Sequence, residues 1–371
     1  MKHHISLVGG QTLPLYVGII ESNADFIHFV YSKDSSESIK VLQDIFKDKK
    51  MKTYECNAFN HAEILSLFNS IVSSFSSSDD FVFNITGGTK LMALAATEVV
   101  QKSKGKAFYF NQDLTFYEIP SFEIRNITKN LEINDYVRLS GNKISCYTDI
   151  SKYKDSDFNA AQRISNFSAA NTKEYSAIHK FKDQRFGNSG SLPVRGDYQI
   201  NNNLFVSWDE NGLDISTSSD SLLELSCKNV HSLFFNAGWW ELLVAQSVNK
   251  WKQKVDLYTN VILPYKNEDS QSKNEIDVLV NTGKRLVFIE CKSGNILASD
   301  INKIKAVRET YGGRIARSLL VSKYKPKSHI IEKCQELDID IFYCYEGYKN
   351  KVTEMDEICR KLDQLIKKSS I

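Results

Sequence analysis

Short apolar runs alternate with amphipathic stretches through the first 110 residues of the chain. The apolar runs have the length and the β-rich composition of strands, and the longer segments between them are typical of helices. The predicted strands are Ile5–Gly9, Phe26–Tyr31, Thr53–Phe59, Phe81–Ile85 and, closing the series, Lys106–Phe110. The predicted helices are Leu13–Glu21, Ser36–Phe46, Asn60–Phe75 and Lys90–Lys102. Strand–helix alternation with short connections predicts an α/β, Rossmann-like domain with a parallel, doubly wound sheet.

The last third of the chain predicts a different order of elements. Ile276, Val278 and Val280 alternate along one run, and a second β-rich run follows the turn Asn281–Gly283. In chain order the predicted elements are a helix at Ser232–Lys250, strands at Val255–Leu263, Glu275–Val280 and Arg285–Cys291, a helix at Ala298–Tyr311 and a strand at Ile315–Ser322.

The middle of the chain is less regular. Ser151–Asn188 is polar and partly helical, and strands at Tyr198–Ser207 and Leu213–Ser216 flank the hairpin turn Asp209–Gly212. We interpret this part as a small connecting module, either winged-helix-like or an ordered linker without activity. The predicted domains are therefore residues 1–148, 149–226 and 227–371.

Charge and cysteine usage narrow the class of protein. The 371 residues carry a net charge of only +2, so a nucleic-acid surface would have to be local. The region between residues 303 and 327 is basic, and lysines of this kind are ordinarily solvated or, beside a metal site, track a phosphate backbone. Its members are Lys303, Lys305, Arg308, Arg314, Arg317, Lys323, Lys325 and Lys327.

The seven cysteines are scattered without a CxxC pair, which argues against a zinc site and a disulfide framework. We find no signal peptide and no apolar run of membrane length, so the expected protein is soluble and cytoplasmic, with no membrane partner.

Charged side chains end the two strands predicted within Asn274–Gly294. Glu290 and Lys292 are two residues apart and share a strand face, and the neighbouring strand would bring Asp277 alongside. Burying these charges is costly unless they pair or bind a cation, and two carboxylates suit Mg²⁺ or Mn²⁺. The alternative is an exposed ion pair on a sheet edge.

Asp277 and the tripeptide Glu290-Cys291-Lys292, in this order of elements, resemble the signature of PD-(D/E)xK restriction-endonuclease-like nucleases. Ile276 stands where that motif has proline. The resemblance implies a divalent metal held by Asp277, Glu290 and the Cys291 carbonyl, with Lys292 catalytic. It also implies a glutamate on the first helix, for which Glu241 is the candidate; the alternative is an exposed helix carboxylate.

Glycine pairs follow two of the predicted N-terminal strands, at the edge where ligands of doubly wound sheets bind. The loops are Gly9–Pro14 and Asn84–Lys90. Paired glycines allow close approach of a ligand, and the following helix offers free N–H groups to an anion. This is phosphate-binding chemistry without a Walker A or GxGxxG pattern; the alternative is an ordinary strand-to-helix turn.

The second loop is similar to the fingerprint of CRISPR-associated Rossmann-fold (CARF) domains, which sense cyclic oligoadenylates. Together the two resemblances indicate a DUF1887-type ancillary nuclease of type III CRISPR defence. They imply a homodimer, allosteric activation by cyclic tetra-adenylate, and a preference for single-stranded DNA and RNA. The alternatives are a duplex-DNA nickase, a constitutive DNA endonuclease, and a ligand-gated binding protein with an inactive nuclease fold. The residues implied for the activator are Gly10, Gln11, Thr12, Leu13, Asn84, Thr86, Gly87, Gly88, Thr89, Lys90, Asn111 and Gln112.

Overall fold

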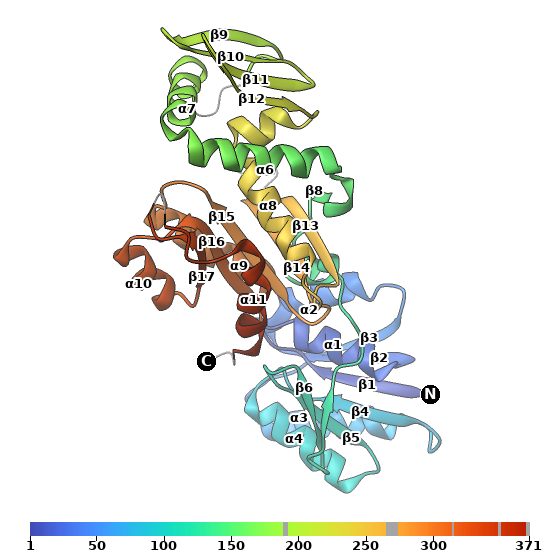
Figure 1. The fold of residues 1–371 in the computed structure, drawn as a ribbon. Coiled ribbons are helices and arrows are strands. Elements are labelled where there is room, and N and C mark those ends of the chain that lie inside the picture. The colour runs from blue at the N-terminus through green and yellow to red at the C-terminus, as the bar shows by residue number, and fades with distance from the viewer. Residues whose placement is uncertain (188–191, 265–273, 314, 348–349, 369–371) are drawn as a thin grey trace.

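The computed structural model describes residues 1–187, 192–264, 274–313, 315–347 and 350–368. Three sheets organise these residues into three parts (Figure 1). The N-terminal part, blue to cyan, lies at one end of the molecule, the green and yellow-green part lies at the other, and the orange to red part lies between them. None of the helices in the described ranges combines the length and the apolar composition that a bilayer crossing needs.

The first sheet has the strand order β3-β2-β1-β4-β5-β6-β7, and its first five strands are parallel. Helices α1 and α2 pack on one face against Ile27 and Phe29, and α3 and α4 pack on the other against Phe83, so the predicted doubly wound sheet is confirmed. The strands are β1 (Lys2–Leu7), β2 (Phe26–Tyr31), β3 (Lys50–Glu55), β4 (Asp80–Asn84), β5 (Lys106–Phe110), β6 (Thr115–Ile119) and β7 (Ile124–Asn126). The helices are α1 (Leu13–Ser22), α2 (Ser36–Ile45), α3 (His61–Ser73) and α4 (Lys90–Lys102).

Two details of this sheet differ from the prediction. The sheet does not close at β5, because β6 and β7 add two antiparallel strands to it. The third strand begins at Lys50 and ends at Glu55, three residues earlier than its predicted start, because the apolar residues that follow it belong to the loop before α3. Strand order reverses between β1 and β4, and this switch point is where the two glycine-rich loops emerge.

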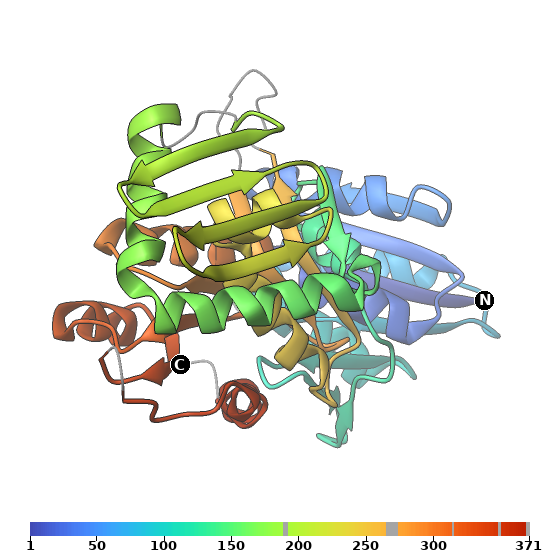
Figure 2. The same ribbon diagram turned by 45° about the horizontal axis from the view of Figure 1, so that its top comes forward.

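The connecting module is ordered and larger than a linker. Two helices precede a four-stranded antiparallel sheet of order β12-β11-β10-β9, which Figure 2 shows face-on in front of the rest of the chain. The predicted strand Tyr198–Ser207 is in fact two strands joined by a tight turn, and Asp209–Gly212 forms the predicted hairpin turn. The elements are α6 (Asp155–Ala170), α7 (Thr172–Phe186), β9 (Gly196–Asn201), β10 (Leu204–Trp208), β11 (Gly212–Thr217) and β12 (Ser221–Ser226).

The last sheet has the order β17-β16-β15-β14-β13-β8, antiparallel from β8 to β15 and parallel from β15 to β17. The predicted helix–strand–strand–strand–helix–strand order is confirmed, and two helices and a strand follow it. The elements are α8 (Gly238–Asn249), β13 (Asp256–Leu263), β14 (Asn274–Asn281), β15 (Leu286–Lys292), α9 (Ala298–Gly312), β16 (Arg317–Tyr324), α10 (Ser328–Glu336), β17 (Asp340–Tyr345) and α11 (Ile358–Lys367).

The predicted helix Ser232–Lys250 is two pieces. A short π-helical segment, His231–Phe235, ends before Ala237, whose left-handed backbone (φ 60°) breaks the helix. A short strand, β8 (Cys146–Asp149), pairs with β13, so the predicted boundary at residue 148 falls inside a strand of the last sheet. Helix α5 (Ile133–Leu139) lies before that strand and contacts both α2 and α9.

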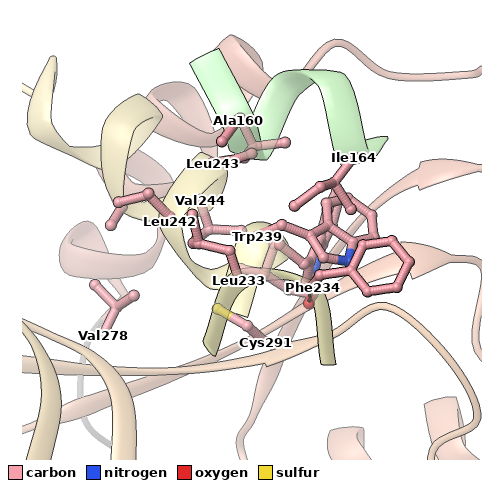
Figure 3. Packing of buried hydrophobic residues seen from close by; sticks show 14 of the residues in the cluster. Ala160, Ile164, Leu233, Phe234, Trp239, Leu242, Leu243, Val244, Val278 and Cys291 are labelled. Carbon is pink, nitrogen blue, oxygen red and sulfur yellow. Dashed lines mark hydrogen bonds between the residues drawn. The ribbon is translucent and has the colours of Figure 1, made fainter. Parts of the chain in front are cut away.

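One apolar core joins the module to the last sheet. Ala160 and Ile164 of α6 lie over α8, and the opposite side of α8 faces Val278 and Cys291 of the sheet (Figure 3). The module therefore covers the helix that carries Glu241.

Lys323 of β16 is buried at this junction. Its ammonium donates to Ser168 Oγ of α6 (3.0 Å) and lies over the ring of Trp239 (5.1 Å). Burial lowers the pKa of Lys323 to about 8, and no carboxylate in the described ranges pairs with it. Below pH 8 the folded state carries a charge that is costly to bury. Between pH 8 and the unfolded value of about 10.5 the folded state loses its proton first, so stability rises with pH.

We expect Lys323→Met to stabilise the fold by about 1–2 kcal/mol at pH 7 and to flatten the rise in stability above pH 8, because methionine fills the space without a charge. Urea unfolding at pH 7 and pH 10 measures both effects. Equal stabilisation at the two pH values would show that the lysine carries no burial penalty.

Candidate active site and ligand cavity

Asp277 and Glu290 meet where two antiparallel strands separate. The β14–β15 ladder runs from Asn281–Leu286 to Val278–Ile289 and ends there, one residue short of both carboxylates. Beyond that point the N–H of Cys291 donates to Asp277 Oδ2 at 2.6 Å instead of to the neighbouring backbone. The splayed strands therefore place both carboxylates at the mouth of a wedge, as the strand pattern predicts.

Lys292 completes this cluster. Its Nζ lies 2.9 Å from Glu290 Oε1 and 3.6 Å from Asp300 Oδ1 of α9, and the Glu290 side chain is 8% exposed. Burial alone would lower the pKa of Lys292, but the carboxylates of Glu290 and Asp300 outweigh it and raise the pKa. Lys292 is thus a permanent cation beside the buried Glu290 and the half-buried Asp300, and the alternative of an exposed edge ion pair is wrong.

The carboxylates carry more negative charge than Lys292 compensates. Burial, and then the charge of Glu290, raise the pKa of Asp277 to about 7. Burial and the charge of Asp277 raise the pKa of Glu241 to about 9. A cation between these groups would relieve both the burial cost and the repulsion, so the donor set fits a hard divalent ion.

The arrangement of side chains provides two carboxylate ligands for a metal ion, and not three. Within the described ranges, no group of three or more His, Cys, Asp or Glu side chains is arranged to hold a metal. Asp277 and Glu290 are therefore the side chains that could serve as ligands, with the backbone carbonyl of Cys291 as the third donor suggested by the motif. Glu241 belongs to the same electrostatic cluster but does not join them in a three-carboxylate ligand set.

Glu241 lines a separate pocket of about 260 Å³. It stands in the first turn of α8, after the break at Ala237. Asn260, in a left-handed conformation (φ 49°), donates to the Tyr153 hydroxyl at 3.0 Å on the same pocket wall. Lys152 and Tyr153 of the connecting module line this pocket, so the module reaches the acidic cluster, which no motif in that polar segment indicates.

The basic stretch after the site is not one surface. Arg308, Arg317 and Lys323 are buried, and the guanidinium of Arg308 donates to the carbonyl of Asp338 at 2.7 Å. Lys325 forms an ion pair with Glu346, and Arg314 lies outside the described residues. The interpretation of these residues as a phosphate-tracking face is wrong for the buried members, because they are not exposed at the surface.

A cavity of about 1,120 Å³ lies against the glycine-rich loops, at the switch point of the first sheet. This volume is slightly above the range typical of ligand sites, roughly 300–1,000 Å³. Nine of the twelve residues predicted for the activator line it: Gly10, Gln11, Thr12, Leu13, Thr86, Gly87, Gly88, Asn111 and Gln112. A Cβ at Gly87 would lie 2.1 Å from the carbonyl oxygen of Leu7, so only glycine allows the two loops to approach this closely.

The other three residues lie outside the cavity. Asn84 is buried, and its amide donates to the Pro14 carbonyl (3.1 Å) and accepts from Thr86 N–H (3.1 Å), which fixes the two loops together. Thr89 caps α4 and donates to the Ala58 carbonyl at 2.7 Å. Lys90 is exposed at the start of α4. Asn84 and Thr89 thus shape the loop, although the sequence suggests that they contact a ligand.

The opposite wall of the cavity comes from elements that sequence motifs do not mark. Tyr136 of α5, the carboxyl end of α9 and the start of β16 face the glycine-rich loops. The end of α9 and the start of β16 lie more than two hundred positions after the glycine-rich loops. Their contact depends on tertiary packing, so no local pattern could have found them.

Fold and site together define a Rossmann-like domain with a loop-lined cavity, joined to a nuclease-type domain with an acidic cluster at a splayed strand pair. Residues 3–136 match the Card1 CARF domain family, and residues 227–355 match the Card1-like endonuclease domain family. The chain therefore belongs to the proteins that combine a CARF domain with a Card1-like endonuclease domain, and both resemblances seen in the sequence are confirmed.

Solved structures share the fold over the whole chain. Can2 from Sulfobacillus thermosulfidooxidans, in complex with cyclic tetra-adenylate, is 16% identical with a TM-score of 0.71 and covers 99% of this chain and 100% of its own. Protein VC1899 from Vibrio cholerae is also 16% identical, with a TM-score of 0.71, and covers 98% and 97%. A type III CRISPR defence DNA nuclease activated by cyclic oligoadenylate is 14% identical with a TM-score of 0.63, and covers 100% of this chain but 53% of its own. No curated protein sequence matches the chain.

Proposed function

We propose that this protein is a metal-dependent endonuclease of type III CRISPR defence that cyclic tetra-adenylate activates allosterically. Its substrates are single-stranded DNA and RNA, whose phosphodiester bonds it hydrolyses. The observation that carries the proposal is the cluster of Asp277, Glu290 and Lys292 at the splayed strands. The CARF and endonuclease domain families, and the cyclic tetra-adenylate bound by the similar Can2 structure, support it.

Asp277 and Glu290, with the Cys291 carbonyl, would hold Mg²⁺ or Mn²⁺. When bound, such an ion supplies Lewis-acid polarisation of the phosphate and a more acidic water. Lys292, held in place by Glu290 and Asp300, orients the attacking water and stabilises negative charge on the phosphate in the transition state. Glu241, whose pKa is raised, is available to hold a proton at the edge of the cluster or to reach the metal through water.

The cavity at the glycine-rich loops is the proposed ring site. The backbone N–H groups of Gly87 and Gly88 precede α4, where the positive end of the helix dipole favours a phosphate. Two large apolar side chains are exposed nearby. Phe59 is 73% exposed and follows Ala58, whose carbonyl accepts a hydrogen bond from Thr89. Leu94 lies on α4 and is 61% exposed. A two-fold homodimer formed through this face would cover them and match the two-fold symmetry of the ring.

Cleavage assays with the purified chain test the proposal. We expect little cleavage of labelled single-stranded DNA and RNA by the chain alone, strong cleavage with cyclic tetra-adenylate and Mn²⁺ or Mg²⁺, and background levels after EDTA. A chelator acts because it removes the ion that the two carboxylates would hold.

Other outcomes would point to other functions. Cleavage that is independent of the ring indicates a constitutive nuclease, and ring binding without cleavage at any metal concentration indicates an inactive nuclease fold. A supercoiled plasmid beside the single strands reveals nicking of duplex DNA.

A further inference from the structure

A second pocket lies beside the acidic cluster, where the connecting module meets the endonuclease domain. Its volume is about 260 Å³, below the roughly 300–1,000 Å³ typical of small-molecule sites. Most of the residues that line it have polar side chains, and Leu233 and Leu242 add apolar surface. We call it the Glu241 pocket. Its small size and mixed lining suit a flat, polar group such as a single nucleobase.

Asn260 of β13 is turned into this pocket by an irregularity of the strand. Thr259 pairs with Thr148 of β8, and Ile262 pairs with Cys146, so β13 has one residue more than β8 between these two pairs. The backbone of Asn260 is left-handed (φ 49°). Adjacent residues of a regular strand point to opposite faces, yet Thr259 and Asn260 both line the pocket. Bulges that re-aim a side chain in this way are over-represented next to active sites.

The pocket lies next to the site where the phosphate would be cut. The ladder between β13 and β14 pairs the residues on either side of Asn260 with those on either side of Asp277, so these two positions are in register. Glu241, which belongs to the acidic cluster, lines the pocket as well. A nucleic-acid strand that presents a phosphate to the acidic cluster therefore brings an adjoining nucleotide to the pocket.

The Asn260 carboxamide is held in place and still has hydrogen-bonding groups to offer. It donates to the Tyr153 hydroxyl at 3.0 Å, and that hydroxyl lies 3.1 Å from Thr259 Oγ1. Within the described ranges this is the one hydrogen bond of the carboxamide, so an N–H and the carbonyl oxygen remain for a ligand. A donor and an acceptor side by side match the edge of a base, as in the bidentate pairing of asparagine with adenine.

Lys152 supplies positive charge at the edge of the pocket. Its side chain is exposed, and it is the cation among the lining residues that the structure describes. A cation beside a base-sized pocket fits the phosphate of the same nucleotide, because lysine attracts phosphates whatever the sequence of the strand. Lys152 and Tyr153 both come from the connecting module, so the module forms part of this site.

We propose that the Glu241 pocket binds one unpaired nucleotide of the substrate strand, next to the phosphate that is cut. Asn260 contacts the edge of its base, and Lys152 contacts its phosphate. This proposal rests on the proposed function, and it gives the connecting module a part in substrate binding. A base inside a duplex reaches such a pocket only by leaving its stack and its partner, so the pocket favours cleavage of single strands.

Cleavage kinetics of the full chain test the base contact, with labelled single-stranded DNA and RNA at saturating cyclic tetra-adenylate and Mn²⁺. Asn260→Gly removes the carboxamide and leaves a residue that accepts the left-handed backbone. We expect KM to rise about 3- to 10-fold, the size of one hydrogen bond, with kcat within about twofold. Asn23→Gly is the matched control: Asn23 has the same φ of 49°, is exposed at the end of α1 and lies outside both cavities, so KM should change less than about twofold.

Lys152→Gln tests the phosphate contact. We expect KM to rise and the dependence of log kcat/KM on log salt concentration to become shallower by about one, as for the loss of one phosphate contact. Lys252→Gln is the control, because Lys252 is an exposed lysine of the endonuclease domain outside the pocket. Melting temperatures show that each variant folds.

A scan with abasic substrates locates the nucleotide. In this scan, oligonucleotides lack one base at a time around the cleaved bond. We expect one position at which the missing base raises KM about 3- to 10-fold. Asn260→Gly should lose this sensitivity, because the base and the carboxamide are partners in the same contact.

The outcomes separate this inference from the proposed function. If Asn260→Gly keeps the KM and the abasic profile of the unmodified chain, or if Asn23→Gly raises KM as much, the pocket binds no base and the inference is wrong. Equal cleavage rates on a fully paired duplex and on single strands would also overturn it, although cleavage activated by the ring and the metal would stand. If the unmodified chain cleaves no nucleic acid with ring and metal present, the proposed function itself fails, and the inference fails with it.

Discussion

Glu290→Gln is expected to lower ring-activated cleavage by at least about 10²–10³-fold, the loss typical when one group that stabilises transition-state charge is removed. Glutamine keeps the shape of the side chain and can still accept a hydrogen bond from Lys292, but it removes one of the two carboxylates at the splayed strands. Metal affinity therefore falls together with the hold on Lys292. Initial rates at saturating ring and increasing Mn²⁺ measure the loss.

Ring binding provides the internal check for this variant. The Kd for cyclic tetra-adenylate should stay within about twofold of the unmodified value, because Glu290 lies outside the ligand cavity. Glu332→Gln is the matched control, since it removes an exposed carboxylate of α10 in the same domain and should leave cleavage unchanged. Retention of full cleavage by Glu290→Gln would show that the chemistry happens elsewhere.

Gly10→Trp is expected to abolish activation by blocking the proposed binding site of the ring. Gly10 lines the cavity, and a Cβ at this position meets no atom within 4 Å, so a side chain there points into open space. An indole in this space takes the place of the ring without distorting the loop. We expect the Kd for cyclic tetra-adenylate to rise at least about 100-fold, which corresponds to about 2.7 kcal/mol. Isothermal titration calorimetry measures this change.

A graded series at the same position shows whether steric blocking is the cause. Gly10→Ala adds a single methyl group to the open space and should bind the ring nearly as well as glycine does. If alanine and tryptophan weaken binding equally, the backbone freedom of Gly10 matters and not the space above it. If neither weakens binding, the ring site lies away from these loops.

The cluster of charged residues at the splayed strands could be predicted because its members are close in the sequence. Asp277, Glu290 and Lys292 lie on two consecutive strands joined by a tight turn, so strand periodicity alone places them on one face. The glycine-rich loops were predictable for a similar reason, since each directly follows a strand of an alternating pattern. At the strand pair and at the loops, the geometry follows from residues that are neighbours in the sequence.

Features that depend on distant packing could not be predicted. The four residues of β8 pair with β13 more than one hundred positions later, and a segment this short has no periodicity to read. The break before Gly238 lies in an apolar stretch whose composition is helical throughout, and the left-handed Ala237 appears only in the structure. Asn84 and Thr89 were expected at the ligand because their side chains can bind one, whereas the fold uses them to hold the loops.

The pairing of β8 with β13 limits how such a protein can evolve. The strand comes from the chain before the module, yet it forms the edge of the endonuclease sheet, and the N–H of Ser145 adds a further bond to the Ile262 carbonyl at 2.9 Å. Recombination at residue 227 could not simply replace the endonuclease domain by a different effector domain. The new domain would lack this edge strand, and β8 would stay behind without its partner β13. The connecting module is thus inserted into the endonuclease domain, between its edge strand and the rest of its sheet.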